Sequence, residues 1–224
     1  MERTVLSEYG HYNACQNIPT MNDSTKIRLL LFDLGGVLMQ LNDPIEIFAP
    51  GCDEPEFHRR WLLSPAVRAH ECGSISAEQF ANDVTREMQL PYDAKTFLAR
   101  FGGWPADPYP EAIDIIGRID AQIDCAILSN TNAFHWDNLD IANAFANRFD
   151  RYFLSYETGL LKPDDHAFTH VADEYNCEPD QILFFDDNAL NIAAAAGLGI
   201  HATLCRSGAD VAETLDSWGF LTSA

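Results

Sequence analysis

Short hydrophobic runs alternate with helix-like segments along most of this chain. Each run predicts a β-strand, and the runs cover residues 28–33, 124–130, 151–156, 181–187 and 200–205. Helices are predicted between and after these runs, over about 133–147, 164–176, 188–199 and 209–217. Strands that are hydrophobic throughout and alternate with helices indicate a parallel sheet covered on both faces. The pattern therefore predicts an α/β fold with a doubly wound parallel sheet.

The interval from about residue 43 to residue 105 has a different pattern and contains no convincing strand. Hydrophobic residues recur at helical spacing from Ile75 to Met88, which predicts an amphipathic helix that begins after Ser76. Asp93 is expected to cap a second helix that ends near residue 101. The predicted organisation is an N-terminal extension (1–26), a core domain (27–42 and 106–224) and a helical cap domain inserted into it (43–105).

The chain is strongly acidic, with 34 aspartates and glutamates against 14 lysines and arginines, and a formal net charge of −20. A nucleic-acid partner is disfavoured because phosphate backbones require a basic face. An anionic membrane surface is disfavoured for the same reason. Two interpretations of the acidity stay open, namely solubility and adaptation to high salt.

The six cysteines form no C-x-x-C pair, and several lie inside hydrophobic runs, as Cys125 does. They are expected to be buried free thiols in a reducing compartment. No hydrophobic segment reaches the length of a membrane span, and the first 26 residues lack the centre of a signal peptide. These features predict a cytoplasmic protein, either a monomer or a homodimer.

Polar side chains gather where the predicted strands end. In an open parallel sheet, ligands bind beyond the carboxyl ends of the strands. The residues expected there, in strand ends or in the loops that follow, are Asp33, Ser129, Asn130, Lys162, Asp186 and Asp187. Three carboxylates in one cleft raise each other's pKa unless a cation offsets their charge. Oxygen ligands of this kind suit Mg²⁺, and a carboxylate beside Mg²⁺ and a lysine can attack phosphorus to form an aspartyl-phosphate.

Four motifs carry a resemblance to a known family. "FDLGGVL", "LSNTN", "LKPD" and "FFDDNALNI" occur in this order between Phe32 and Ile192. Together they resemble the haloacid dehalogenase-like hydrolases, in which a Rossmann-like core carries a cap between the first and second motifs. The resemblance implies Asp33 as nucleophile. It implies that Ser129 and Asn130 hold the phosphoryl oxygens, that Lys162 stabilises charge, and that Mg²⁺ is bound by Asp33, the Gly35 carbonyl, Asp187 and Asp186, supported by Asn191.

The sequence of the predicted cap resembles one particular group within this family. "HECGSISAEQFANDVTREMQLP", residues 70–91, looks like the sugar-phosphatase group that acts on alpha-D-glucose 1-phosphate. The resemblance thus implies a small phosphorylated metabolite as substrate, such as a hexose 1-phosphate.

Position 35 departs from the pattern of most phosphatases in the family, which have a second aspartate there as general acid and base. Gly35 has no side chain that could transfer a proton. Either the leaving group needs little protonation, or another group such as His70, Glu71 or a water supplies it. Two further alternatives stay open: a metal-independent haloacid dehalogenase, and a degenerate binding protein.

Overall fold

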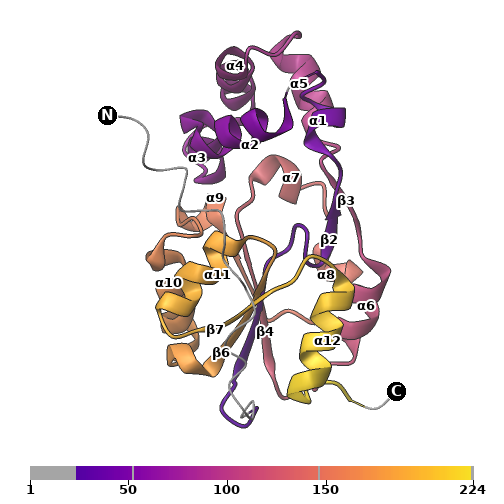
Figure 1. The fold of residues 1–224 in the computed structure, drawn as a ribbon, viewed down its shortest axis with the longest axis vertical. Helices are drawn as coiled ribbons and strands as arrows, with labels where there is room; N and C mark the ends of the chain where they lie inside the picture. The colour runs from indigo at the N-terminus through magenta and orange to yellow at the C-terminus, as the bar shows by residue number, and fades with distance from the viewer. Residues whose placement is uncertain (1–23, 52, 146, 223–224) are drawn as a thin grey trace.

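The centre of the protein is a five-stranded parallel sheet (Figure 1). The structure is a computed structural model, and it describes residues 24–51, 53–145 and 147–222. The strands are β1 (Leu29–Phe32), β4 (Asp124–Ser129), β5 (Arg151–Leu154), β6 (Ile182–Asp186) and β7 (His201–Leu204), in the order β5-β4-β1-β6-β7. All the carboxyl ends therefore lie at one edge of the sheet, and β1 lies in the middle, between β4 and β6.

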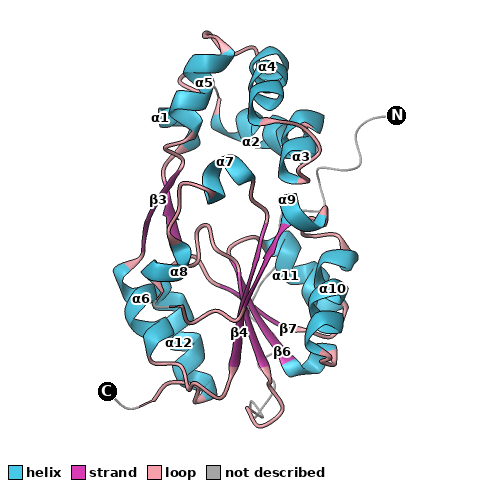
Figure 2. Ribbon diagram, turned by 180° about the vertical axis from the view of Figure 1, so that it is seen from behind, coloured by secondary structure: helices cyan, strands magenta, loops and turns pink. Residues whose placement is uncertain are grey.

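Alternating side chains of the central strand explain why both faces of the sheet are covered. Leu29 and Leu31 pack in one hydrophobic cluster with α10 (Asp165–Tyr175) and α11 (Ala189–Gly197). Leu30 and Phe32 pack in another with α6 (Pro110–Gly117) and α12 (Gly208–Trp218). Figures 1 and 2 show these two pairs of helices on opposite sides of the sheet. The predicted α/β fold with a doubly wound parallel sheet is confirmed.

A group of helices, here called the cap, lies beyond the carboxyl edge of the sheet (Figure 1). It consists of α1 (Pro44–Ile47), α2 (Glu54–Leu63), α3 (Pro65–Glu71), α4 (Ala77–Met88) and α5 (Ala94–Phe101). Two short antiparallel strands, β2 (Met39–Leu41) and β3 (Pro105–Pro108), connect it to the core. The cap has its own hydrophobic core, in which the rings of Phe48, Phe80, Phe97 and Phe101 pack together. The domain limits expected from the sequence stay a prediction.

The two helices predicted in this region each begin with the expected N-terminal capping residue. The Ser76 side chain accepts a hydrogen bond from the backbone N–H of Gln79 at the start of α4. Asp93 likewise accepts from Thr96 at the start of α5. A side-chain acceptor at this position satisfies a backbone donor that has no partner within the helix.

The single helix predicted over about 133–147 is wrong. The structure has two short helices there, α7 (Ala133–Trp136) and α8 (Ile141–Ala144). The Asn138 side chain bonds the carbonyl of Phe134 at 2.6 Å, and such local bonds compete with helical ones. The predicted strand 151–156 also ends early, at Leu154, and α9 (Ser155–Thr158) follows. Helices α1, α2, α3 and α6 and the pair β2–β3 were not predicted.

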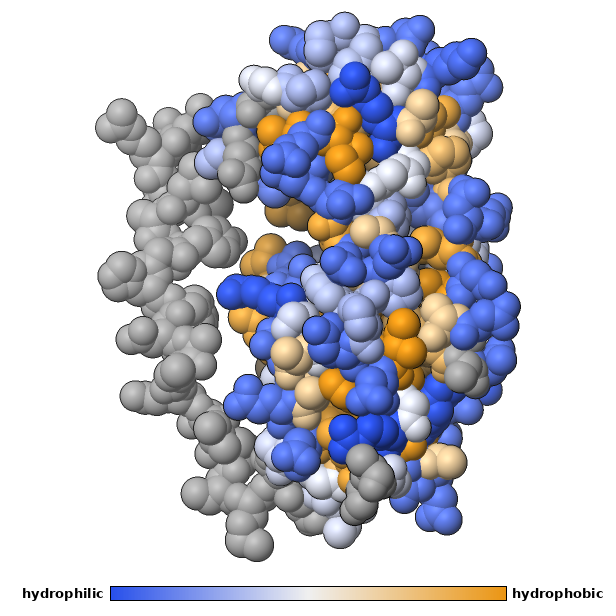
Figure 3. Space-filling model, turned by 90° about the vertical axis from the view of Figure 1, so that its right-hand side faces the viewer, coloured by the Kyte–Doolittle hydropathy of each residue, from blue (hydrophilic) through white to orange (hydrophobic). Residues whose placement is uncertain are grey.

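The cysteines largely follow expectation. Cys125, Cys177 and Cys205 are buried free thiols, whereas Cys72 is only partly buried. Cys15, Cys52 and most of the predicted N-terminal extension lie outside the described residues. No helix in the described part of the chain is long and hydrophobic enough to cross a membrane. The face in Figure 3 is mostly hydrophilic, with hydrophobic residues gathered in patches. The cytoplasmic location and the oligomeric state stay predictions.

Candidate active site

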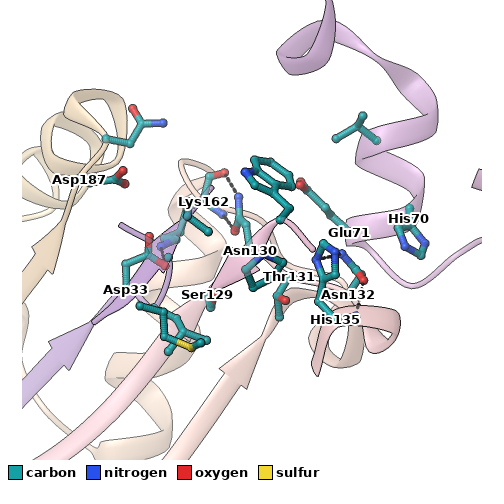
Figure 4. Close-up of a pocket in the computed structure, with 18 of the residues that line it drawn as sticks. Asp33, His70, Glu71, Ser129, Asn130, Thr131, Asn132, His135, Lys162 and Asp187 are labelled. Atoms are coloured by element: carbon teal, nitrogen blue, oxygen red, sulfur yellow. Dashed lines mark hydrogen bonds and ion pairs between the residues drawn. The ribbon is translucent and has the colours of Figure 1, made fainter. Parts of the chain in front are cut away.

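A cavity of about 310 Å³ lies between the carboxyl edge of the sheet and the cap (Figure 4). Its volume falls at the lower end of the range of small-ligand sites, about 300–1,000 Å³. Most residues predicted for the site line it, namely Asp33, Gly35, His70, Glu71, Ser129, Asn130, Lys162, Asp187 and Asn191. Asp186 does not line the cavity, because it is fully buried behind Lys162.

A buried lysine between two aspartates forms the centre of the core side of the cavity. Lys162 Nζ lies 2.8 Å from Asp33 Oδ1 and 2.7 Å from Asp186 Oδ2. Asp33 and Asp186 come together because their strands are neighbours, with Phe32 opposite Phe185. The backbone N–H of Asp33 also donates to the Phe185 carbonyl at 2.8 Å. The sheet therefore fixes the spacing of the two carboxylates, and the lysine joins them.

Burial controls the protonation of this cluster. It raises the pKa of Asp33 to about 7, an effect that Lys162 opposes and that Asp186 and Asp187 strengthen. Burial alone would lower the pKa of Lys162, but the attraction of Asp33 and Asp186 outweighs it, so the pKa of the lysine is raised. The lysine is thus held as a cation, while Asp33 needs further positive charge to be fully ionised at neutral pH.

Asp186 uses both its oxygens within the protein. It accepts hydrogen bonds from Lys162 Nζ, from the Asn188 backbone N–H at 2.8 Å, and from Asn191 Nδ2 at 2.9 and 3.0 Å. A carboxylate that is buried and bonded in this way orients its donors. Asp186 and Asn191 therefore act on the position of Lys162 and on the start of α11.

Asp187 is the more accessible acid at the end of β6 and lies against the glycine turn. Gly36 has a φ of +75°, and a Cβ there would stand 2.5 Å from Asp187 Oδ2. Carboxylate oxygens of Asp33, Asp186 and Asp187 lie within 4.8 Å of one another. Such a group of hard oxygen donors beside a backbone turn fits Mg²⁺. When bound, a divalent cation neutralises charge and polarises a phosphoryl oxygen.

Asn130 and Ser129, at the end of β4, differ in what their side chains do. Asn130 Nδ2 donates to the Lys162 carbonyl and its Oδ1 accepts from the Lys162 backbone N–H, both at 2.9 Å. The Asn130 amide therefore holds the loop that carries the lysine. Both residues line the cavity. Ser129 offers its hydroxyl there, and the Asn130 Nδ2 group has a second N–H besides the one that bonds the loop.

The space beside Gly35 is filled by a hydrophobic side chain. A Cβ at Gly35 would meet Leu41 Cδ1 at 3.2 Å and Cδ2 at 3.3 Å. Leu41 belongs to β2, and it lines the cavity together with Met39 of the same strand. No positive φ requires a glycine at position 35. Position 35 thus lacks the second acid, and Leu41 occupies the space that the side chain of such an acid would enter.

The two cap candidates, His70 and Glu71, occupy different environments. His70 is buried, and its ring stacks on Phe80 with centroids 4.3 Å apart. Burial lowers the pKa of His70, which keeps its ring neutral. Burial raises the pKa of Glu71 to about 7, although Arg68 and Lys162 oppose the shift. In Figure 4, Glu71 extends from α3 toward the side of the cavity where Asn130 and Lys162 lie, and His70 lies beyond it.

Several cavity residues were not predicted from the sequence. Asn132 caps α7 and accepts from the His135 backbone N–H at 2.9 Å, while His135 Nε2 lies 2.9 Å from the Phe101 carbonyl. This histidine joins the core to the cap. The hydrophobic lining from the cap is Trp61, Val67, Phe80, Phe101 and Trp104. An Asn at the start of a helix signals a cap, but no local signal in the sequence places these rings around a ligand.

This fold and this set of residues define a hydrolase of one family. The chain belongs to the haloacid dehalogenase-like hydrolases, whose family model matches residues 27–199.

Similar proteins include a phosphatase and a structure with bound magnesium. The chain is 23% identical to the D-ribitol-5-phosphate phosphatase of Bacteroides thetaiotaomicron over 207 residues, 84% of this chain and 97% of the relative. A HAD family enzyme of the same organism, solved with magnesium and inorganic phosphate, is 27% identical with a TM-score of 0.65, over 80% of this chain and 93% of that one. The L-2-haloacid dehalogenase of Xanthobacter autotrophicus, at 18% identity and a TM-score of 0.57 over 80% and 77%, shares the fold.

Proposed function

We propose that this protein is a Mg²⁺-dependent phosphatase that hydrolyses a small phosphate monoester through an aspartyl-phosphate on Asp33. The observation that carries the proposal is the buried Asp33–Lys162–Asp186 cluster, with Asp187 beside it, on one side of a cavity of ligand size. The phosphatase among the relatives and the magnesium and phosphate in a similar structure support the same chemistry.

In this mechanism the side chains of the core have distinct tasks. Asp33 attacks phosphorus, and Lys162 holds the attacking carboxylate in place and offsets charge on the phosphoryl group. The Ser129 hydroxyl donates to a phosphoryl oxygen, while Asn130 positions the lysine. Asp33, Asp187 and the carbonyl of Gly35 would hold Mg²⁺, with Asp186 and Asn191 supporting them.

We further propose a phosphorylated sugar or sugar alcohol as the substrate. His70, which is 4% exposed, is one of the cap residues that line the cavity, and its Nε2 has no hydrogen-bond partner among the described residues. Buried polar atoms are normally satisfied, and a substrate hydroxyl would satisfy this one. Hexose 1-phosphates, implied by the cap sequence, and D-ribitol 5-phosphate, named for the relative, are the first candidates.

The test is phosphate release by the full chain from a panel of sugar and sugar-alcohol phosphates with Mg²⁺. Asp33→Asn should lower turnover by about 10⁴–10⁶-fold, the scale on which loss of a nucleophile acts in other hydrolases. Chelation of the metal should also stop turnover. The exposed Asp165→Asn is the matched control and should retain activity. Turnover that survives both Asp33→Asn and chelation would refute the proposal.

The alternatives make different predictions in the same assay. A dehalogenase would release halide from a 2-haloacid without metal, but the second acid Asp187 at the cavity favours a metal-dependent reaction. A degenerate binding protein would bind a phosphate ester and release no phosphate.

A further inference from the structure

We propose that Glu71, at the end of cap helix α3, is the proton donor and acceptor that replaces the acid missing at Gly35. The inference rests on the proposed phosphatase function. It assigns the proton transfers to the cap, so that the core carries out attack on phosphorus and the cap completes the reaction when it covers the substrate.

The first argument is the environment of Gly35. Leu41 fills the space that a side chain at position 35 would enter, and Met39 and Leu34 also line this part of the cavity. These side chains neither donate nor accept protons. A leaving-group oxygen on this side of Asp33 therefore finds no acid on the neighbouring strand.

The second argument is elimination among the titratable side chains of the cavity. Within the described residues, those outside the cluster of aspartates and lysine are His70, Glu71 and His135. His135 holds its proton against the Phe101 carbonyl on Nε2, and its Nδ1 faces the Asn132 amide at 3.3 Å. His70 is neutral and stacked on Phe80. Neither histidine carries a spare proton at neutral pH.

The third argument is the position and charge of Glu71. It is partly buried, lines the cavity, and points from the cap toward the core side (Figure 4). The charged groups that act on it are Arg68 on its own helix and Lys162 from the core. Both favour its ionised form, yet burial is the larger effect and brings its pKa to about 7. A carboxyl group with this pKa can donate and accept a proton in one catalytic cycle near neutral pH.

The two steps balance in atoms and charge. As an Asp33 oxygen bonds to phosphorus, the bond from phosphorus to the leaving oxygen breaks, and that oxygen keeps the electron pair and takes the proton of Glu71. In the second step a water oxygen attacks phosphorus, Glu71 takes the proton of the water, and the bond to Asp33 breaks. The products are an alcohol and inorganic phosphate, and Glu71 ends in its protonated form.

The experiment compares Glu71→Gln with wild type on two esters, D-ribitol 5-phosphate and p-nitrophenyl phosphate, using the full chain with Mg²⁺. For the sugar-alcohol ester, whose leaving group needs a proton, kcat/KM should fall by about 10²–10⁴-fold. For the nitrophenyl ester, whose leaving group needs none, kcat/KM should stay within a few-fold of wild type. The second step lacks its base, so Glu71→Gln should release a stoichiometric burst of nitrophenol before slow turnover.

The pH profile provides a second readout. In wild type, kcat/KM for the ester that needs a proton should fall as pH rises through about 7, because Glu71 loses its proton. Glu71→Gln should abolish that limb. Glu78→Gln, an exposed glutamate on α4, is the matched control and should behave as wild type. If Glu71→Gln lowered kcat/KM equally on both esters, its role would be structural and the inference would be overturned. The inference would also be overturned if Glu71→Gln behaved like Glu78→Gln. Failure of wild type to release phosphate from any ester would instead refute the proposed function.

Discussion

The two sides of the cavity are built in different ways. The core side consists of charged groups at strand ends, with Lys162 within 2.8 Å of two carboxylates. The cap side consists of packed rings, such as Trp61 and Trp104 with centroids 5.3 Å apart, together with His70 and Glu71. In the proposed function, the core side attacks phosphorus, and the cap side recognises the substrate and protonates the leaving group. Substitutions on the cap side should then change the choice of substrate more than the attack on phosphorus.

The largest effect should come from breaking the ion cluster of the core side. Lys162→Met leaves Asp33 and Asp186 buried without their cation, and removal of one partner of a buried pair costs about 3–5 kcal/mol. Denaturant unfolding without metal should show this loss in the free energy of unfolding. The matched control is Lys95→Met on α5, an exposed lysine, which should change stability by less than about 0.5 kcal/mol. Equal stability of the two variants would contradict the role given to the cluster.

The next effect concerns His135, which joins the core to the cap and should make the stability of the protein depend on pH. Burial lowers the pKa of His135 from 6.5 to about 4. Its ring stays neutral in the folded state while the unfolded chain takes up a proton, so its contribution to stability is complete above pH 6.5 and is lost as pH falls toward 4. The difference amounts to about 3 kcal/mol.

Denaturant unfolding at pH 7 and pH 5 measures this effect. His135→Asn should have a shallower pH dependence of stability than wild type, whereas the exposed His166→Asn should not. If the free energy of unfolding of His135→Asn depended on pH as steeply as that of wild type, the burial of His135 would not be the cause of the pH dependence.

A smaller effect should come from the backbone beside Asp187, the proposed metal ligand. Gly36→Ala would push a methyl group onto Asp187, so Mg²⁺ affinity should fall by about 10–100-fold, as for other groups that position metal ligands. The dependence of the melting temperature on Mg²⁺ concentration measures this without activity. Gly219→Ala is a matched control, because Gly219 has the same φ of +75° and nothing within 4 Å of its Cβ position. A loss of Mg²⁺ affinity in both variants would assign the effect to backbone strain.

The smallest effect should come from the surface contact between cap and core. Arg68 pairs with Asp164 at 2.7 Å, but the two side chains are 61% and 51% exposed. Arg68→Gln should change the free energy of unfolding by less than about 1 kcal/mol, and KM should rise, because this pair joins α3 of the cap to the core. Arg59→Gln breaks an exposed pair within the cap and should leave KM unchanged. A larger loss of stability in Arg68→Gln would mean that the cap depends on this pair.

The sequence predicts the core side well because its information is local. A hydrophobic run such as Leu29–Phe32 predicts a buried strand, and the next residue, Asp33, must then lie at the edge of the sheet. The roles of the individual residues within the charged cluster are harder to predict from the sequence. That Asn130 holds the Lys162 loop, and that Asp186 is bonded on both oxygens, depends on contacts between segments 24 and 32 residues apart.

The cap side could not be predicted in the same way. Its lining takes residues from four helices, α2, α3, α4 and α5, and spacing along one helix does not show which side chain reaches the cavity. The wrong helix over 133–147 has a related cause, because the Asn138 side chain replaces a helical bond that the hydrophobic pattern alone would assume. Glu71 could be suggested from the sequence, but its burial and direction depend on how the cap packs.

The contact between position 35 and Leu41 has a consequence for substitutions at this site. An aspartate at position 35 would place its Cβ 3.2 and 3.3 Å from the two Leu41 methyl carbons. Leu41 is 44% exposed, so its side chain would have to shift by only a few tenths of an ångström. The two positions share one space and are therefore coupled, since a smaller residue 41 would leave more room for an acid at position 35.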